Sequence, residues 1–124
     1  MRKTCLIIDS SRMLRRVAGR IVSDMQFKYE EAENGQDAMD ICRLNMPDAI
    51  LVDGKIPVMD GVSFLKCLRE TPGGAQPRVV FCSSDRSVEK ITEALEAGAD
   101  EYIMKPFDSD IVRSKFFEIG LLSA

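Results

Sequence analysis

Four short apolar segments that each end in a polar residue constrain the fold of this chain more than any other feature. The segments are residues 5–8, 49–52, 79–82 and 102–104. Runs of this kind are typical of strands that are buried on both faces of a parallel sheet. The polar residues that follow them are Asp9, Asp53, Ser83 and Lys105. Because parallel strands end at one edge of a sheet, we expect these four side chains to meet there.

Helical patterns alternate with the strand patterns along the whole chain. The expected strands are residues 4–9, 29–33, 49–53, 78–83 and 101–105. The expected helices begin near Ser10–Ser11, after Asn34–Gly35, at Gly61, near Ser87 and near Asp108. Serine, asparagine and aspartate are the residues that cap helix N-termini best. The strict alternation predicts an α/β fold, a doubly wound (βα)5 parallel five-stranded sheet with helices on both faces.

The first expected helix combines an apolar stripe with a basic run. Met13, Leu14, Val17, Ile21 and Met25 recur at helical spacing, the pattern of an amphipathic helix. The apolar residues of the fourth expected helix are Val88, Ile91 and Leu95. The basic residues of the first helix are Arg12, Arg15, Arg16 and Arg20. We interpret this run as a solvated face, with docking of an acidic partner as its functional alternative.

Length and composition exclude several classes of protein. At 124 residues the chain suffices for one core, and we expect a single domain over residues 1–124 with no output domain. A net charge of −3 argues against DNA or an anionic membrane as the main ligand. The absence of histidine excludes Ser-His-Asp triads and ordinary zinc sites. With four scattered cysteines and no apolar segment near the length of a membrane span, we expect a cytoplasmic protein without membrane insertion.

The expected meeting of Asp9 and Asp53 defines the chemistry of the site. Two carboxylates at such a place repel each other, so they need a cation or a shared proton. Mg²⁺ suits two carboxylates, with water and one backbone carbonyl filling its shell. Lys105 adds a positive charge and Ser83 a hydroxyl. A nucleophilic carboxylate with these neighbours suits a covalent aspartyl phosphate.

Three stretches of the sequence resemble the receiver domains of bacterial two-component response regulators, most closely the stand-alone chemotaxis type. They are Ile8-Asp9-Ser10-Ser11-Arg12, the eleven residues from Leu51 to Gly61 that read LVDGKIPVMDG, and Lys105-Pro106-Phe107. The resemblance covers essentially the whole chain and implies the flavodoxin-like strand order 2-1-3-4-5.

The resemblance also implies a role for each matching residue. Asp53 is the phosphoacceptor, loaded from a phosphohistidine of a histidine kinase or a histidine phosphotransfer protein. Asp9 and Asp53, with the main-chain carbonyl of Lys55, hold Mg²⁺. Ser83 and Tyr102 are the hydroxyl and aromatic switch positions. Lys105 binds the phosphoryl group, and its peptide bond to Pro106 is expected to be cis.

Two residues depart from the family pattern. Ser10 replaces the second of two adjacent acids, so it contributes to metal binding only weakly or through water. Lys55 stands where a neutral or acidic residue is usual. The side-chain charges of Asp9, Asp53, Lys55 and Lys105 therefore cancel. We expect weaker Mg²⁺ dependence than usual, with Lys55 standing in part for the metal and shielding the acyl phosphate from water.

We interpret the chain as a single-domain response regulator that is not an enzyme beyond its own phosphorylation and dephosphorylation. Phosphorylation would reshape the surface of the fourth helix, fifth strand and fifth helix, so that a downstream effector protein binds. We expect a monomer, with dimerisation on phosphorylation left open. The alternative, favoured by Ser10 and Lys55, is a phosphorylation-independent module that binds a protein or an anionic nucleotide messenger. A flavodoxin-like cofactor protein would share the topology but lacks a hydroxyl-rich phosphate loop after the first strand.

Overall fold

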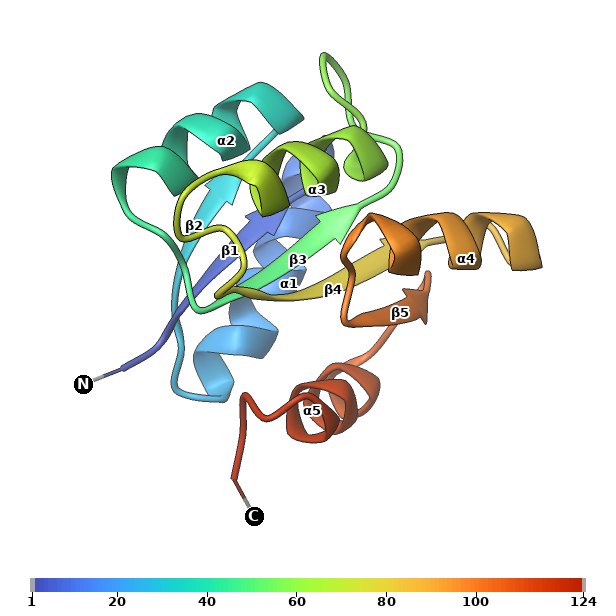
Figure 1. The fold of residues 1–124 in the computed structure, drawn as a ribbon. Coiled ribbons are helices and arrows are strands. Elements are labelled where there is room, and N and C mark those ends of the chain that lie inside the picture. Colours follow the sequence, from blue (N-terminus) through green and yellow to red (C-terminus); the bar gives the residue numbers. More distant parts are fainter. Residues whose placement is uncertain (1, 124) are drawn as a thin grey trace.

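The computed structural model describes residues 2–123 as one alternating series of strands and helices (Figure 1). The strands are β1 (Thr4–Ile8), β2 (Lys28–Ala32), β3 (Ala49–Asp53), β4 (Arg78–Ser83) and β5 (Glu101–Met104). The helices are α1 (Arg12–Asp24), α2 (Gly35–Leu44), α3 (Gly61–Glu70), α4 (Val88–Ala97) and α5 (Ser109–Glu118). The predicted alternation is therefore confirmed, with strand and helix ends within one or two residues of those expected.

The strands form one parallel sheet in the order β2-β1-β3-β4-β5, as predicted. The central strands β1, β3 and β4 are buried along most of their length, whereas β2 is exposed at four of its five residues and lies at an edge. In register, Ile8 pairs with Val52, and Asp53 pairs with Cys82. The carboxyl ends of β1, β3 and β4 consequently lie side by side at one edge of the sheet.

Helices cover both faces of the sheet and create two core layers. Helices α2, α3 and α4 pack on one face, and α1 and α5 pack on the other (Figure 1). The largest fully buried side chains are phenylalanines, Phe64 and Phe81 in the first layer and Phe116 in the second. Full burial of such a side chain contributes about 1.5–3 kcal/mol, so both layers stabilise the sheet that carries the site.

Side chains predicted as N-caps do cap the helices. The side chains of Ser11, Asn34, Asp60, Ser87 and Asp108 each accept a hydrogen bond from the backbone N–H three residues ahead. A cap of this type contributes about 1 kcal/mol to stability. Because each cap fixes where its helix begins, the caps also define the lengths of the loops that follow β1, β2, β3, β4 and β5.

Two of the apolar patterns read from the sequence are only partly buried. On α1, Ile21 and Met25 are buried, but the side chains of Met13, Leu14 and Val17 lie on the surface, with Met13 74% exposed. On α4, Val88 is 73% exposed and the buried residues are Ala94 and Ala97. Leu14 lies on the same face of α1 as the buried Ala18 and Ile21. The first turns of the helix are exposed because they face the loop after β5 across an open cavity, which Leu14 and Val17 line.

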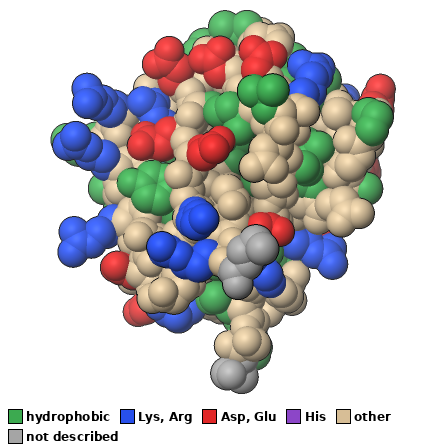
Figure 2. Space-filling model, turned by 90° about the vertical axis from the view of Figure 1, so that its left-hand side faces the viewer, with side chains coloured by type: hydrophobic (Ala, Val, Ile, Leu, Met, Phe, Trp, Pro, Cys, Tyr) green, Lys and Arg blue, Asp and Glu red, His purple; other side chains and the backbone are tan. Residues whose placement is uncertain are grey.

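The described part of the chain has the mixed surface of an ordinary globular protein. Lysine, arginine, aspartate and glutamate side chains alternate with hydrophobic ones across the face in Figure 2. None of the helices within residues 2–123 is both long and apolar enough to cross a membrane. The cysteines are free thiols, and burial raises the pKa of Cys42 to about 11. A buried thiol held in the protonated form is a poor nucleophile, which supports a structural role for Cys42.

Candidate functional site at the carboxyl edge of the sheet

The structure brings both acids and the lysine together at the carboxyl edge of the sheet. Asp9 follows β1, Asp53 ends β3, and Lys105 follows β5. The Lys105 Nζ lies 2.8 Å from Asp9 Oδ2 and 3.2 Å from Asp53 Oδ1. The ammonium therefore bridges two carboxylates that would otherwise repel each other. All three side chains are at most 18% exposed, so solvent screens these interactions only weakly.

Asp9 is held by hydrogen bonds at every polar group. Its N–H donates to the Ala32 carbonyl at 3.1 Å, and its Oδ1 accepts from the Ser11 N–H at 2.8 Å. Its Oδ2 accepts from Lys105, and its carbonyl accepts from Arg15 Nη1 at 2.7 Å. The orientation of the Asp9 carboxylate is consequently over-determined, as expected for a group whose position matters.

Charge and burial oppose each other at Asp53 and Lys105. Burial raises the pKa of Asp53; the positive charge of Lys105 counteracts this rise, and the negative charge of Asp9 adds to it. Burial also disfavours the charged ammonium of Lys105, but its hydrogen bond to Asp9 and the charge of Asp53 outweigh this, so its pKa is raised. Lys105 thus stays a cation, and any further positive charge nearby would stabilise the ionised form of Asp53.

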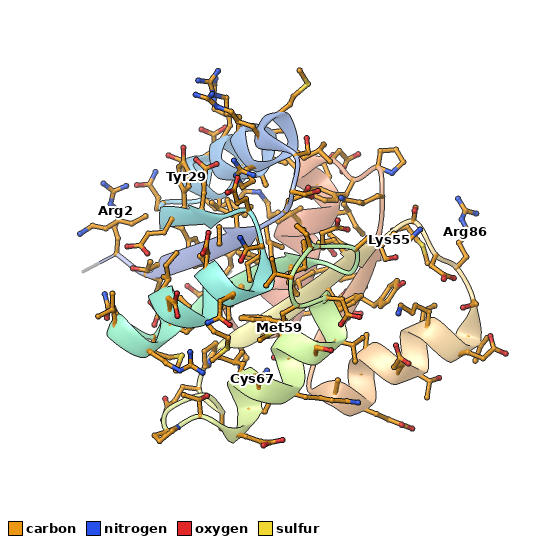
Figure 3. All side chains as sticks on the ribbon, turned by 90° about the horizontal axis from the view of Figure 1, so that it is seen from above. Arg2, Tyr29, Lys55, Met59, Cys67 and Arg86 are labelled. Atoms are coloured by element: carbon orange, nitrogen blue, oxygen red, sulfur yellow. The ribbon has the colours of Figure 1, made fainter. Side chains whose placement is uncertain are left out.

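Ser10 and Lys55, the two departures from the family pattern, lie at the exposed rim of this site. Ser10 follows Asp9 directly, and the main-chain N–H of Lys55 donates to the Asp53 carboxylate. Figure 3 shows Lys55 on the loop after β3, with Arg86 on the loop after β4. The side chains of Ser10 and Lys55 are both exposed to solvent at this rim.

The donor set suits a hard divalent cation but is small. Within residues 2–123 no three acidic, histidine or cysteine side chains gather in a way that would hold a metal. Asp9 and Asp53 provide two carboxylates, and Mg²⁺ commonly needs only one or two, with water and phosphate oxygens completing its shell. The residues therefore fit Mg²⁺, although the Lys105 ammonium already offsets one of the two negative charges.

Ser83 and Tyr102 are joined by a residue that we did not single out from the sequence. Ser83 is 3% exposed at the end of β4, and its Oγ accepts from the Asp85 N–H at 3.1 Å. The Tyr102 hydroxyl donates to the Asp85 carbonyl at 2.7 Å, and its ring stacks on Phe81 with centroids 5.5 Å apart. The Asp85 backbone thus connects both side chains. Its sequence signal was weak, a D-x-S turn, in which the Asp85 carboxylate accepts from the Ser87 N–H.

The loop after β5 forms one wall of a small apolar cavity beside the site. The Lys105–Pro106 peptide bond is cis. A cavity of about 270 Å³ opens between α1 and this loop, and its lining residues are Leu14, Val17, Ser84, Lys105, Pro106 and Phe107. Lys105, which contacts Asp9 and Asp53, thus belongs both to the cavity wall and to the site. The cavity walls include two of the α1 side chains that we had expected from their spacing to belong to an amphipathic stripe.

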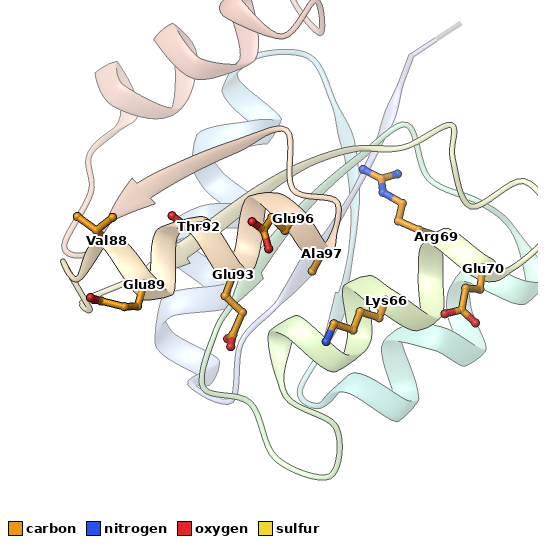
Figure 4. Close-up of a pocket in the computed structure, with 9 residues that line it drawn as sticks. All are labelled: Lys66, Arg69, Glu70, Val88, Glu89, Thr92, Glu93, Glu96 and Ala97. Carbon is orange, nitrogen blue, oxygen red and sulfur yellow. The ribbon is translucent and has the colours of Figure 1, made fainter.

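A second hollow lies between α3 and α4 (Figure 4). Its volume is about 740 Å³, and its walls carry acidic side chains, including Glu89, Glu93 and Glu96 of α4. The side chains that line it are distinct from all of the predicted site residues. Size alone therefore does not mark the site, whereas converging charges do.

Comparison with known proteins identifies the family. Residues 5–116 match the response regulator receiver domain. The chain belongs to the receiver domain family of two-component systems. Over 119 residues it is 31% identical to the chemotaxis protein CheY of Halobacterium salinarum, covering 96% of this chain and 98% of that protein. The match over nearly the full length of both proteins supports a receiver domain of the stand-alone CheY type.

Solved structures of other receiver domains have the same fold. The chemotaxis response regulator CheY4 of Vibrio cholerae has a TM-score of 0.90 at 24% identity, covering 96% of this chain and 99% of that one. The receiver domain of the sensor histidine kinase PA1611 from Pseudomonas aeruginosa has a TM-score of 0.87 at 19% identity, covering 95% and 97%. The latter protein was solved with a magnesium ion coordinated in its active site cleft.

Proposed function

We propose that the chain is a phosphorylation switch in which Asp53 accepts a phosphoryl group from a partner phosphohistidine. The observation that carries this proposal is the Lys105 ammonium, which lies between the carboxylates of Asp9 and Asp53. A buried carboxylate beside a fixed cation is arranged to attack a phosphorus atom and to neutralise the charge on its oxygens.

The transfer balances with groups that the chain and its donor supply. An Asp53 carboxylate oxygen attacks phosphorus, the P–N bond of the phosphohistidine breaks, and the imidazole nitrogen keeps the electron pair and is later protonated. Lys105 then shares its hydrogen bonds between Asp9 and the phosphoryl oxygens. The reaction modifies the chain itself, so the domain acts as a signalling protein and catalyses only its own phosphorylation and dephosphorylation.

Asp9, Asp53 and the main-chain carbonyl of Lys55 would hold Mg²⁺. When bound, the metal supplies positive charge for the phosphoryl oxygens. Because Ser10 provides no carboxylate and Lys105 and Lys55 together balance the charges of Asp9 and Asp53, we propose that the metal binds weakly and that Lys55 takes over part of its role. Isothermal titration of Mg²⁺ into wild type and Ser10→Asp tests this: the variant should bind Mg²⁺ more tightly, and equal dissociation constants would end the idea.

The contacts of Asp85 support a route from the site to the surface. When the Ser83 hydroxyl turns toward the phosphoryl group, its hydrogen bond with the Asp85 N–H is given up. The Tyr102 hydroxyl is bound to the carbonyl of the same residue. A shift of this loop therefore changes the environment of Tyr102 and the start of α4. We propose that this reshapes the surface of α4, β5 and α5 for a downstream effector.

The exposed face of α1 suits the phosphohistidine-bearing partner. Met13, Leu14 and Val17 are exposed beside the cavity that adjoins Lys105, and Arg12 and Arg16 flank them. An apolar patch with basic neighbours favours a partner helix that carries apolar and acidic side chains. Docking on α1 would bring a phosphohistidine close to Asp53. We therefore propose a histidine kinase or a histidine phosphotransfer protein as the donor.

Intact mass measurement after incubation with acetyl phosphate and Mg²⁺ tests the proposed function. Wild type should gain about 80 Da, one phosphoryl group, and Asp53→Asn should gain nothing. A matched control is Asp48→Asn, because Asp48 binds the Thr4 N–H away from the site and its loss should leave the mass gain intact. Unmodified wild type at every metal concentration would instead favour a phosphorylation-independent binding module, the alternative to which Ser10 and Lys55 point.

A further inference from the structure

Arg15 differs from the rest of the basic run on α1. We expected the run to be a solvated face, but the Arg15 side chain is only 12% exposed, whereas that of Arg20 is 84% exposed. The Arg15 Nε donates to Glu31 Oε1 at 2.9 Å, and its Nη1 donates to the Asp9 carbonyl at 2.7 Å. A buried guanidinium with two such partners has a fixed place in the structure.

The bond to Asp9 connects α1 with the phosphorylation site. The Asp9 peptide is held on one side by the Ala32 carbonyl in β2 and on the other by Arg15. Hydrogen bonds from a charged donor are roughly twice as strong as neutral ones, so Arg15 restrains the turn after β1 firmly. The carboxylate of Asp9 is thereby directed to Lys105.

We propose that Arg15 is a positioning residue for phosphorylation of Asp53, an inference that rests on the proposed function. Arg15 holds Asp9 so that the Lys105 ammonium is shared between two carboxylates. If Asp9 turns away, Lys105 pairs with Asp53 alone and masks the oxygen that must attack phosphorus. The effect is strong in this chain because Ser10 provides no second acid that could take the place of Asp9.

Removing Arg15 should slow phosphorylation without weakening the binding of the donor. Asp9 is one of the proposed Mg²⁺ ligands, and loss of a residue that holds a metal ligand in place typically costs about 10–100-fold in metal affinity or activity. For Arg15→Gln we expect a maximal rate with acetyl phosphate about tenfold lower, at saturating Mg²⁺, with KM within about twofold of wild type. Glu31→Gln, which removes the negative charge from one of the two partners of Arg15 but keeps an acceptor oxygen, should lower the rate less. Arg15→Lys keeps the positive charge but lacks the planar guanidinium that donates to two partners at once, so its rate should fall between those of wild type and Arg15→Gln.

Arg43→Gln is the matched control. The Arg43 side chain is 50% exposed and pairs with Asp40 at 3.7 Å on the surface of α2. This variant should phosphorylate at the wild-type rate. Rates are measured by intact mass per folded molecule, with the folded fraction taken from urea unfolding. A purely structural role for Arg15 would lower stability and leave the rate per folded molecule unchanged.

Amide hydrogen exchange gives a second readout that does not require phosphorylation. The Ser11 N–H donates to Asp9 Oδ1, so Arg15→Gln should accelerate its exchange severalfold while Arg43→Gln leaves it unchanged. A phosphorylation rate for folded Arg15→Gln within twofold of wild type, or unaltered exchange at Ser11, overturns the proposed role of Arg15 but leaves the proposed function intact. Wild type that takes up no phosphoryl group overturns the proposed function and this inference together.

Discussion

Replacing Lys105 by methionine tests the electrostatics on which the site depends. The change removes the ammonium but keeps an unbranched apolar stem of similar length. Asp9 and Asp53 would then face each other without the cation that lies 2.8 Å from one and 3.2 Å from the other. Two buried carboxylates in this position repel each other and lose a hydrogen-bond donor. The folded state should therefore lose stability at neutral pH.

The distances set the size of this loss. With an effective dielectric constant of about 20, Coulomb's law gives about 6 kcal/mol for the Lys105–Asp9 pair and about 5 kcal/mol for the Lys105–Asp53 pair. Most of this attraction is cancelled by the cost of removing the ammonium from water. Removing one partner of a buried ion pair costs about 3–5 kcal/mol of stability. Because these groups keep some exposure to solvent, we expect a value near the lower end of that range. We therefore expect a loss of about 3 kcal/mol.

The loss should depend on pH in a defined direction. Burial already raises the pKa of Asp53, and Lys105 counteracts that rise, so removing Lys105 raises this pKa further. A carboxyl with a raised pKa in the folded state stabilises the fold only when protonated, so stability falls as the pH rises through that pKa. The destabilisation by Lys105→Met should be largest at neutral pH and should shrink as the pH falls through the raised pKa of Asp53, because a proton then replaces the lysine.

Urea unfolding in metal-free buffer measures this loss, and Lys115→Met is the control. Lys115 also bridges two carboxylates, 3.5 Å from Glu101 and 3.3 Å from Glu118, but the side chains of these acids are 28% and 49% exposed. Exposed pairs contribute about 0–1 kcal/mol, so Lys115→Met should cost at most about 1 kcal/mol. Equal losses for the two variants, or a loss for Lys105→Met that does not shrink at lower pH, would refute the reasoning.

Three further substitutions test other parts of the structure. Asp53→Asn should raise the free energy of unfolding at neutral pH, because burial raises the pKa of this carboxyl and its ionisation destabilises the folded state. The gain should appear in urea unfolding as the pH rises through the raised pKa, and a gain that grows toward low pH would contradict this sign. Tyr102→Phe should cost about 1 kcal/mol, because its hydroxyl binds the Asp85 carbonyl, and unchanged thermal unfolding would show that this bond contributes nothing. Gly61→Ala should cost about 2 kcal/mol, since a Cβ there would lie 2.8 Å from the Asp53 carbonyl oxygen; a wild-type urea midpoint would mean that the loop yields freely.

The main features of the fold could be predicted because they depend on local patterns. Apolar runs indicated the strands, and the residues that cap helices indicated where each helix begins. The polar residue at the end of each run then predicted which edge of the sheet carries the site. For the same reason Asp9, Asp53 and Lys105 could be named from the sequence, since parallel strands leave little choice about where their carboxyl ends lie.

Other features could not be predicted because they depend on neighbours far away in the sequence. Helical spacing shows which residues share a face of a helix, but it does not show which part of that face other elements bury. It therefore did not reveal that Met13 and Val88 are exposed. Asp85 carries only the weak signal of a D-x-S turn; its importance comes from Ser83 and Tyr102, which belong to different strands. The role of such a loop residue becomes visible only when the strands are assembled.

The amino-acid sequence by itself determined the order of strands and helices and the edge of the sheet at which two acids and a lysine converge. It did so because hydrophobic periodicity and chain direction can be read from a few neighbouring residues. Only the tertiary structure decided that Lys105 bridges both carboxylates and that Arg15, unlike Arg20, is buried against Asp9. Burial and charge pairing of this kind depend on groups brought within a few ångströms by packing, and no local pattern records those distances.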